Sequence, residues 1–433
     1  MANIFISFYN GVSDPNNPNA IPCFYETFCN CLEKLGNKLF VYTRRSFNLD
    51  FENIPKNLLS EIKEFNPDLI ILFNNAFYDV SKHFDCPIVV YEVDSPLLYL
   101  NKEGLKKNIS RYKFFVPQEE SVKVLQEQFG VDKKDILLVP FFTEIRAEDT
   151  EFKTNISFIG TKFIYSTRKS PFAKFMTQNP DDEEVKLYKI LLDEFCENVY
   201  LDKDELFKKY NVQSKNIDKR FQVSELLQYL SDYNRVKTLS SVADLGLDLY
   251  GTANWRSDTY NEPWLILSYK NKAVYSIKHN QDIYNSSKIG ININHLQAKT
   301  GFSWRVCDIM ASNACLVSEY KSDLKRCFPE IDIPFFTNSY EAREQCVKLL
   351  NNENLRKDIV LQSQAAINKS YRFSNVKRIM EEYLHMQLEG NGSGETKFLM
   401  NNDEAKKSIK FKIRLMMYLY NKLSRKLIEE GLI

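Results

Sequence analysis

The stretch KTGFSWRVCDIMASNACLVSE, residues 299–319, joins a glycine-led loop to a helical pattern and then to a short apolar run. The pattern predicts a helix that begins near Arg305. The first N–H groups of a helix have no partner within it, and the helix dipole is positive there, so this end can bind a phosphate. A loop, helix and strand in this order are typical of a parallel α/β domain whose ligand lies at the carboxyl edge of the sheet.

Side chains in this stretch suit a diphosphate attached to a sugar. Gly301 would let the backbone approach a ligand closely, and Ser303 can cap the helix or donate a hydrogen bond. Arg305 can pair with a phosphate, and Asp308 can accept hydrogen bonds from ribose or sugar hydroxyls. The alternative is ordinary loop and capping chemistry, because an acid in the first turn of a helix is favourable without a ligand.

The same alternation of apolar runs and helical patterns extends over most of the chain. In the first part, a helix that ends at Gly36 supplies the first crossover. The predicted strands there are 3–8, 38–43, 68–73, 87–92, 113–117 and 136–140. The pattern restarts after a polar stretch near Thr150. The predicted strands that follow are 154–161, 247–255, 273–277, 288–294, 315–320 and 333–337.

We therefore predict an α/β fold class with two Rossmann-like, doubly wound domains that face a cleft. Residues 1–150 form the first domain, and residues 151–388 form the second, which carries the predicted site for a diphosphate attached to a sugar and a helical insertion at about 165–238. A flexible linker is expected at 389–397, and a basic amphipathic helical tail at 398–433. The tail could lie on an anionic membrane surface, or it could dock on the body of the protein or on a partner.

The composition excludes several classes of protein. Lys and Arg number 58 and Asp and Glu number 57, a net charge of +1, which argues against a protein that binds nucleic acid through its overall charge and leaves open only a local basic patch. The nine cysteines contain no C-x-x-C pair, which is typical of free thiols in a reducing compartment. The N-terminus lacks the pattern of a signal peptide, and no apolar run is long enough to span a membrane. We therefore expect a cytoplasmic protein.

The order of the motifs resembles that of glycosyltransferases with the GT-B fold, specifically the CgeB-like branch named for a spore maturation protein. The resemblance covers roughly residues 155–383 without the insertion, and it rests on NISFIGTKFIYSTR, LDLYGTANW, DIYNSSKIGININ and, above all, GFSWRVCDIMASNACLVSEY. In the first domain it rests on YEVDSP. Related donor sites often carry a glutamate eight positions before the acid, where this chain has Thr300, and the family usually has glycine where this chain has Asn313.

The resemblance implies a metal-independent enzyme that uses a nucleotide sugar as donor and needs no cofactor. Gly301, Phe302, Ser303 and Arg305 would hold the diphosphate, and Asp308 would hold the ribose. Further donor-binding candidates are Gly160, Arg168, Trp255, Lys278, His279, His295 and Thr300. Each has a structural alternative: a tryptophan at a strand end often packs under a loop, and a lone histidine is often structural.

Asp94 is the candidate catalytic base, because it ends a predicted strand at the cleft side of the first domain. An inverting transferase needs such a group to take the proton of the acceptor hydroxyl. Asp94 could instead be a turn residue before Ser95, and the base could be Glu26 or Asp14. An acidic metal motif formed with Glu92 is disfavoured by the two-domain layout.

The sequence therefore predicts a glycosyltransferase that acts on a glycan, a lipid-linked sugar or a glycosylated protein. Bacterial surface polysaccharide, capsule or glycoconjugate biosynthesis is the expected setting, with peripheral contact at the inner face of the membrane through the tail. Two alternatives stay open, a catalytically inactive nucleotide-sugar-binding protein and a GT-B sugar-nucleotide epimerase.

Overall fold

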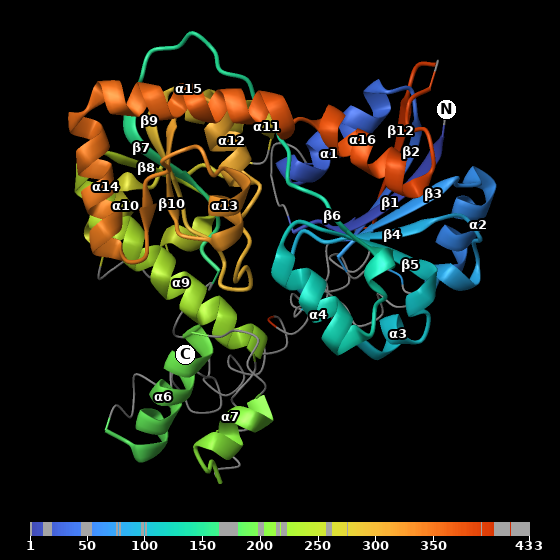
Figure 1. The fold of residues 1–433 in the computed structure, drawn as a ribbon, viewed down its shortest axis with the longest axis horizontal. Coiled ribbons are helices and arrows are strands. Elements are labelled where there is room, and N and C mark those ends of the chain that lie inside the picture. The colour runs from blue at the N-terminus through green and yellow to red at the C-terminus, as the bar shows by residue number, and fades with distance from the viewer. Residues whose placement is uncertain are drawn as a thin grey trace, which may run out of the picture.

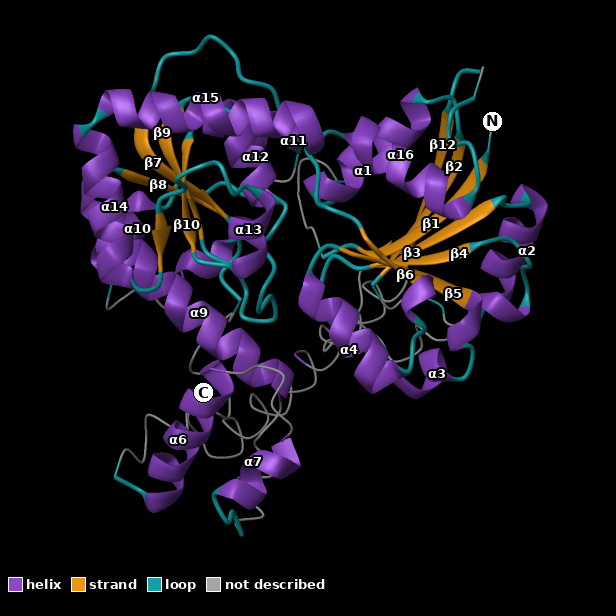
Figure 2. Cartoon of the chain, viewed as in Figure 1, coloured by secondary structure: helices purple, strands orange, loops and turns teal. Residues whose placement is uncertain are grey.

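The computed structural model describes residues 2–11, 20–44, 54–74, 77, 79–96, 99, 102–163, 181–197, 203–213, 217, 223–256, 262–274, 276–390, 392–401 and 416. These residues form two parallel sheets, each covered by helices, with a group of helices projecting from the second (Figures 1 and 2). Arg168, Asp14 and nearly all of the predicted tail lie outside the described residues.

The first sheet has seven strands in the order β12-β2-β1-β3-β4-β5-β6, and all its neighbours pair in parallel. Its strands are nearly continuous apolar runs because helices cover both faces. The strands are β1 (Asn3–Tyr9), β2 (Lys38–Arg44), β3 (Leu69–Phe73), β4 (Ile88–Tyr91), β5 (Tyr112–Val116), β6 (Ile136–Leu138) and β12 (Glu395–Asn401). The helices are α1 (Cys23–Lys34), α2 (Lys56–Phe65), α3 (Lys102–Lys106) and α4 (Glu119–Phe129), with 3₁₀ turns at Val80–Lys82, Ile109–Arg111 and Lys133–Asp135.

The second sheet has five strands in the order β11-β10-β9-β7-β8, again parallel. The strands are β7 (Thr154–Ile159), β8 (Leu247–Tyr250), β9 (Ser287–Asn292), β10 (Cys315–Glu319) and β11 (Phe335–Phe336). The helices are α9 (Val223–Val242), α10 (Pro263–Ser268), α11 (Ile277–Asn285), α12 (Arg305–Ala311), α13 (Ser322–Cys327), α14 (Ser339–Asn351) and α15 (Glu353–Ser370), with 3₁₀ turns at Ala243–Leu245 and Ala253–Arg256. The expected α/β class with two Rossmann-like domains is confirmed.

The expected helical insertion includes α6 (Glu183–Glu197), α7 (Lys203–Lys209) and most of α9. Helices α6 and α7 lie beyond the end of α9 that is distant from the sheet (Figure 1). They enclose a small apolar core of their own, formed by Tyr188, Leu191, Leu192, Leu206, Ile217 and Leu227. The other end of α9 packs against α14, so this one helix connects the insertion to the body of the second domain.

The predicted strand at 273–277 is wrong. Ser276 accepts a hydrogen bond from the backbone N–H of His279 and caps α11, which begins at Ile277. A serine with extended backbone before a helical pattern is a strong N-cap, and here this local signal prevails over the β propensity of the run AVYSI.

The C-terminal part of the chain returns to the first domain, which differs from the expected domain boundary at residue 388. Helix α16 (Phe373–Leu384) packs there, with the Phe373 ring 5.8 Å from that of Phe28 and the Tyr383 ring 5.7 Å from that of Phe115 (Figure 1). Residues 395–401, expected as the end of the linker and the start of a helical tail, instead form strand β12 beside β2. This pairing covers an edge strand that would otherwise present unpaired backbone groups.

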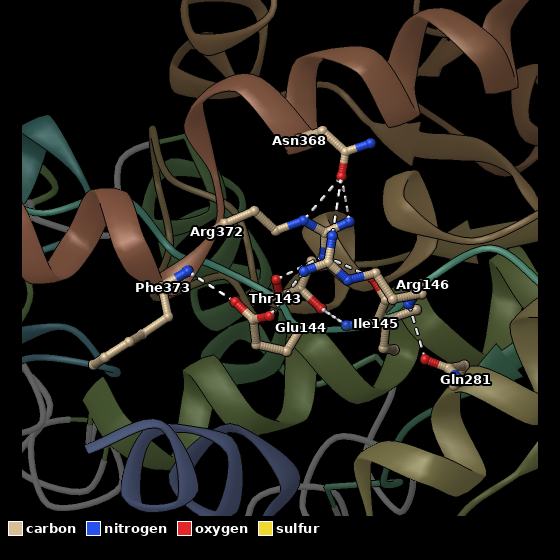
Figure 3. Close-up of polar contacts among 8 residues, drawn as sticks. All are labelled: Thr143, Glu144, Ile145, Arg146, Gln281, Asn368, Arg372 and Phe373. Atoms are coloured by element: carbon tan, nitrogen blue, oxygen red, sulfur yellow. Dashed lines mark hydrogen bonds and ion pairs between the residues drawn. The ribbon is translucent and has the colours of Figure 1, made fainter. Parts of the chain in front are cut away.

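The two domains are joined by residues 139–153 and by the junction between α15 and α16. Arg372, at that junction, donates hydrogen bonds to the carbonyl oxygens of Thr143 at 2.9 Å and Ile145 at 2.6 Å (Figure 3). The Asn368 side chain holds the same guanidinium, with a distance of 2.7 Å to Nη2. The backbone N–H of Phe373 donates to the Glu144 carboxylate at 3.0 Å. The buried Arg372 therefore joins the two interdomain connections, residues 139–153 and the α15–α16 junction, by hydrogen bonds.

Candidate functional site

A cavity of about 510 Å³ lies between the two domains. The first domain contributes the segments that follow β1, β4 and β5, and the second contributes those that follow β7, β8 and β9, together with residues of α9, α11 and α12. The carboxyl edges of both parallel sheets therefore open onto one space, which is where open α/β sheets bind ligands. Among the predicted site residues, this cavity brings together Asp94, Gly160, His295, Phe302, Ser303, Arg305 and Asp308.

Arg305 begins helix α12, as predicted, and its guanidinium borders the cavity. Nε donates to the carbonyl oxygen of Ile159 at 2.7 Å, and Nη1 donates to Oδ1 of Asn292 at 3.1 Å. The guanidinium carbon lies 5.2 Å from the centre of the Phe158 ring. These contacts come from the ends of β7 and β9 and fix the direction of the guanidinium without neutralising its charge.

A second arginine, Arg235 of α9, borders the same cavity and was not among the residues predicted from the sequence. It is 3 % exposed, lies over the Phe163 ring at 4.2 Å, and donates to the carbonyl oxygens of Thr161 and Ile293 at 2.6 and 2.9 Å. Burial and the nearby positive charge of Arg305 lower the pKa of Arg235 to about 9. Arg235 shares a buried face of α9 with Ser231, Asp232 and Thr238, and this run of polar residues at helical spacing was the signal that could have identified it.

The two arginines create a positive region suited to an anion. Within the described part of the chain, neither Arg235 nor Arg305 forms an ion pair with a carboxylate. The nearest acid on α9, Asp232, is bound to Lys162 by a buried ion pair of 2.7 Å. Two guanidinium groups that repel each other across a largely buried site would both be stabilised by a phosphate or diphosphate between them.

Several buried polar atoms around the cavity lack a hydrogen-bond partner among the residues that the structure describes. They are Nε of Arg235, Oγ1 of Thr252, Oδ1 of Asn280, the hydroxyl of Tyr284 and Nδ2 of Asn294. Buried polar groups are nearly always satisfied in folded proteins, so a cluster of unsatisfied ones fits a polar ligand. Asn280 and Tyr284 lie on α11, one turn apart, and only their exposed neighbours Lys278 and His279 were predicted from the sequence.

Asp308 lies at the cavity wall, 5 % exposed. Its Oδ1 accepts a hydrogen bond from the Thr143 hydroxyl at 2.6 Å, and its Oδ2 accepts one from Asn280 Nδ2 at 3.5 Å. Burial raises the pKa of Asp308 to about 7, against the lowering effect of these two hydrogen bonds. The contact of Asp308 with a ribose stays a prediction. Through its hydrogen bond with Thr143, Asp308 also connects the cavity to the interdomain segment.

Asp94 faces the cavity from the end of β4. Its Oδ2 accepts a hydrogen bond from Asn74 Nδ2 at 3.0 Å, and its Oδ1 accepts one from Gln297 Nε2 at 2.8 Å. Burial raises the pKa of Asp94, while both amide donors lower it. Asp94 is therefore a carboxylate with remaining acceptor capacity, directed at the cavity from the first domain.

His295 borders the cavity from the segment after β9. Its Nδ1 accepts a hydrogen bond from the backbone N–H of Gln297 at 3.2 Å, so in the neutral ring the proton is on Nε2. Burial and the charge of Arg235 lower the pKa of His295 to about 3. The imidazole is therefore neutral near pH 7 and can donate a hydrogen bond, but its low pKa makes it a poor proton acceptor.

Thr300 and Gly301 contact the first domain and do not border the cavity. The Thr300 hydroxyl accepts from the backbone N–H of Glu120 at 3.3 Å, and the backbone N–H of Gly301 donates to Oε1 of Gln118 at 3.3 Å. A Cβ on Gly301 would lie 2.5 Å from Cβ of Gln118. Glycine is therefore required here because the Gln118 side chain packs directly against the backbone of residue 301. The structure thus gives this glycine a packing role against Gln118, and its contact to a phosphate stays a prediction.

Trp255, Lys278 and His279 also lie away from the cavity. The Trp255 indole is 1 % exposed and donates to the carbonyl oxygen of Gly160 at 2.9 Å, which is the structural alternative of a tryptophan packed under a loop. Lys278 and His279 are exposed on α11, and Lys278 pairs with Asp282 at 3.2 Å.

Two parallel sheets whose carboxyl edges meet across one cavity define the GT-B fold. Residues 234–384, from Arg235 through α16, match the family model described as glycosyl transferase-like. This match includes both arginines and Asp308.

Solved structures show the same fold. The chain is similar to sucrose-phosphate synthase from Thermosynechococcus elongatus, with a TM-score of 0.53 and 9 % identity over 88 % of this chain and 98 % of that chain. It is similar to Anabaena HepE in complex with UDP, with a TM-score of 0.51 and 11 % identity over 89 % of this chain and 100 % of that one. A sequence search of curated proteins finds no match.

Proposed function

We propose that this chain is a glycosyltransferase that moves a sugar from a nucleotide-sugar donor to an acceptor hydroxyl. The observation that carries the proposal is the pair of buried arginines, Arg235 and Arg305, which border one cavity without carboxylate partners within the described ranges. A nucleoside diphosphate is the anion that departs in such a reaction. Prearranged guanidinium groups stabilise the charge that develops on it, which is the role that a metal ion has in other transferases.

The polar groups around the arginines support a nucleotide in the same cavity. Asn280, Tyr284 and Asn294 present donors and acceptors that have no partner within the described ranges and could bind a sugar, ribose or base. Anabaena HepE, a structural relative, has been solved with UDP. We propose a uridine nucleotide as the first donor to test.

The acceptor side is formed by the first domain, with Asp94 as the proposed base. In the transfer step the acceptor oxygen forms a bond to the anomeric carbon while the bond from that carbon to the phosphate oxygen breaks. The hydroxyl proton passes to the Asp94 carboxylate, and the nucleoside diphosphate leaves with the bonding electrons.

The finer setting follows from the sequence resemblance. We propose a cytoplasmic, metal-independent enzyme of the CgeB-like branch that extends a glycan, a lipid-linked sugar or a glycosylated protein in surface polysaccharide or glycoconjugate biosynthesis. The basic tail would provide peripheral membrane contact. Within the described residues, no helix is long and apolar enough to cross a membrane.

Isothermal calorimetry with UDP, GDP and UDP-glucose tests the donor site. Wild type should bind one nucleotide, and Arg235→Ala and Arg305→Ala should each weaken that binding at least tenfold. Arg378→Ala, which removes only an exposed ion pair with Glu382, is the matched control. Equal affinity in all variants would overturn the assignment. Release of nucleotide that depends on an acceptor would then distinguish a transferase from a binding protein, and conversion of the donor without acceptor would indicate an epimerase.

A further inference from the structure

Asp94 receives one hydrogen bond from its own domain and one from the opposite domain. Asn74 belongs to the first domain, where its backbone is left-handed with φ of 60°. Its Oδ1 accepts from the backbone N–H groups of Val93 and Asp94 at 2.9 and 3.0 Å, which holds the turn after β4, while its Nδ2 donates to Asp94. Asn74 therefore fixes the position of Asp94 whatever the position of the second domain.

Gln297 reaches Asp94 from the second domain, on the segment that follows β9. Nε2 donates to Oδ1 of Asp94 at 2.8 Å, and Oε1 accepts from the backbone N–H of Ser95 at 3.2 Å. The amide thus makes a two-point contact with consecutive residues across the cavity. Its own backbone is fixed by the hydrogen bond from Gln297 N–H to His295. Separation of the domains would break both side-chain contacts at once.

The charged form of Asp94 is stabilised mainly by the side-chain amides of Asn74 and Gln297. Nearby titratable groups are Glu92 on the same segment and Tyr25 on α1, and His295 borders the same cavity from the opposite segment. Burial raises the pKa of Glu92 to about 8 and that of Tyr25 well above its usual value, and the pKa of His295 is lowered. In the part of the chain that the structure describes, no lysine or arginine forms an ion pair with Asp94.

We propose that Gln297 is a positioning residue that completes the catalytic base Asp94 only when the two domains are together. This inference rests on the proposed function. In the open protein, Asp94 would keep only the Asn74 hydrogen bond, so its carboxylate would be less well oriented and less stable. Closure would add the Gln297 donor and direct the free lone pairs of Asp94 toward the acceptor hydroxyl. The proton acceptor would thus be assembled in the same state that encloses the donor, which limits loss of the sugar to water.

The direct test is the pKa of Asp94, measured by NMR titration of protein labelled with ¹³C at the aspartate carboxyl carbon, with Asp94→Asn to assign the signal. Gln297→Ala should raise the Asp94 pKa measurably, because a donor to the charged form is lost. Gln297→Glu should raise it further, because a like charge replaces the donor. Arg326→Ala is the matched control, since it removes an interdomain ion pair of 3.0 Å with Glu119 that does not touch Asp94. An Asp94 pKa that is the same in wild type and Gln297→Ala would overturn the proposal.

The second readout separates this inference from the proposed function. The rate of UDP release from UDP-glucose is followed against pH, with water in place of the acceptor. In Gln297→Ala the acidic limb of the profile should move to higher pH together with the Asp94 signal, and in Arg326→Ala it should stay in place. If the pKa of the Asp94 carboxyl shifts in Gln297→Ala while the acidic limb of the pH profile of UDP release stays in place, Asp94 is not the base. Absence of both UDP binding and UDP release in wild type would count against the proposed function with this donor, while the titration would still decide the Gln297 contact.

Discussion

The hydroxyl of Thr143 donates a hydrogen bond of 2.6 Å to the Asp308 carboxylate, and the carbonyl oxygen of Thr143 accepts one of 2.9 Å from Arg372. One residue of the interdomain connection thus contacts both the wall of the cavity and the arginine that fastens the two connections together. A ligand that changes the position of Asp308 would therefore act directly on a segment that connects the two domains.

Asp308→Asn should reduce the pH dependence of stability. Because burial raises the pKa of Asp308 to about 7, the folded protein binds a proton more tightly than the unfolded chain between about pH 4 and 7. The contribution of Asp308 to the free energy of unfolding therefore falls as the pH rises through this range, by roughly 2–4 kcal/mol at most. Urea unfolding at pH 5 and pH 8 should show a smaller loss of stability in Asp308→Asn than in wild type. An identical loss in both proteins would contradict the raised pKa.

Asp323→Ala should weaken the contact between helix α4 and the second domain. Gln118, the N-cap of α4, makes no side-chain cap bond, and Asp323 Oδ2 instead accepts from the backbone N–H of Glu119 at 3.0 Å. The same oxygen accepts from the Thr300 hydroxyl at 3.0 Å. Loss of an N-cap costs about 1 kcal/mol, so the free energy of unfolding should fall by about that amount. Asp332→Ala, an exposed acid in the same domain, should be close to neutral in the same assay.

Arg372→Ala should be strongly destabilising, by about 2–4 kcal/mol, because it leaves the Thr143 and Ile145 carbonyl oxygens without their donors in a buried place (Figure 3). Arg372→Lys should recover only part of this loss, since an ammonium cannot reproduce the planar fork of donors. Chemical denaturation measures both variants. Arg378→Ala, whose ion pair with Glu382 is exposed, should change stability by less than about 1 kcal/mol. A small effect of Arg372→Ala would show that the connection does not depend on this residue.

Gly290→Ala should destabilise the second domain by about 1–3 kcal/mol through overpacking. A Cβ at this position in β9 would lie 2.7 Å from Cγ2 of Ile309, a residue of α12. Ile309→Ala alone should cost about 2–5 kcal/mol because it leaves a cavity. The double variant should cost clearly less than the sum of the two, since each change removes the defect created by the other. Strict additivity in a double-mutant cycle would contradict this packing.

Local patterns in the sequence determined most of the secondary structure. Apolar runs such as NIFISF and DLIILF became central strands, and GFSWRVCDIMA placed Arg305 at the start of a helix, as predicted. Hydrophobic periodicity and capping act over a few residues, so they can be recognised without any knowledge of distant contacts. The same alternation of strands and helices was sufficient for the fold class, because parallel strands and their crossovers bring carboxyl edges to one side.

The tertiary structure alone decided which side chains meet. Arg235 reaches the cavity because α9 packs on the second domain, and Gln297 contacts Asp94, which lies 203 positions earlier in the chain. Residues 395–401 form a strand along the edge of β2, although the sequence predicted the end of a linker and the start of a helical tail there. Thr300 and Gly301 were directed to helix α4, away from the cavity, by the same domain contact. The sequence encodes local periodicity directly, whereas the partners of a loop residue depend on how two separately folded sheets pack against each other.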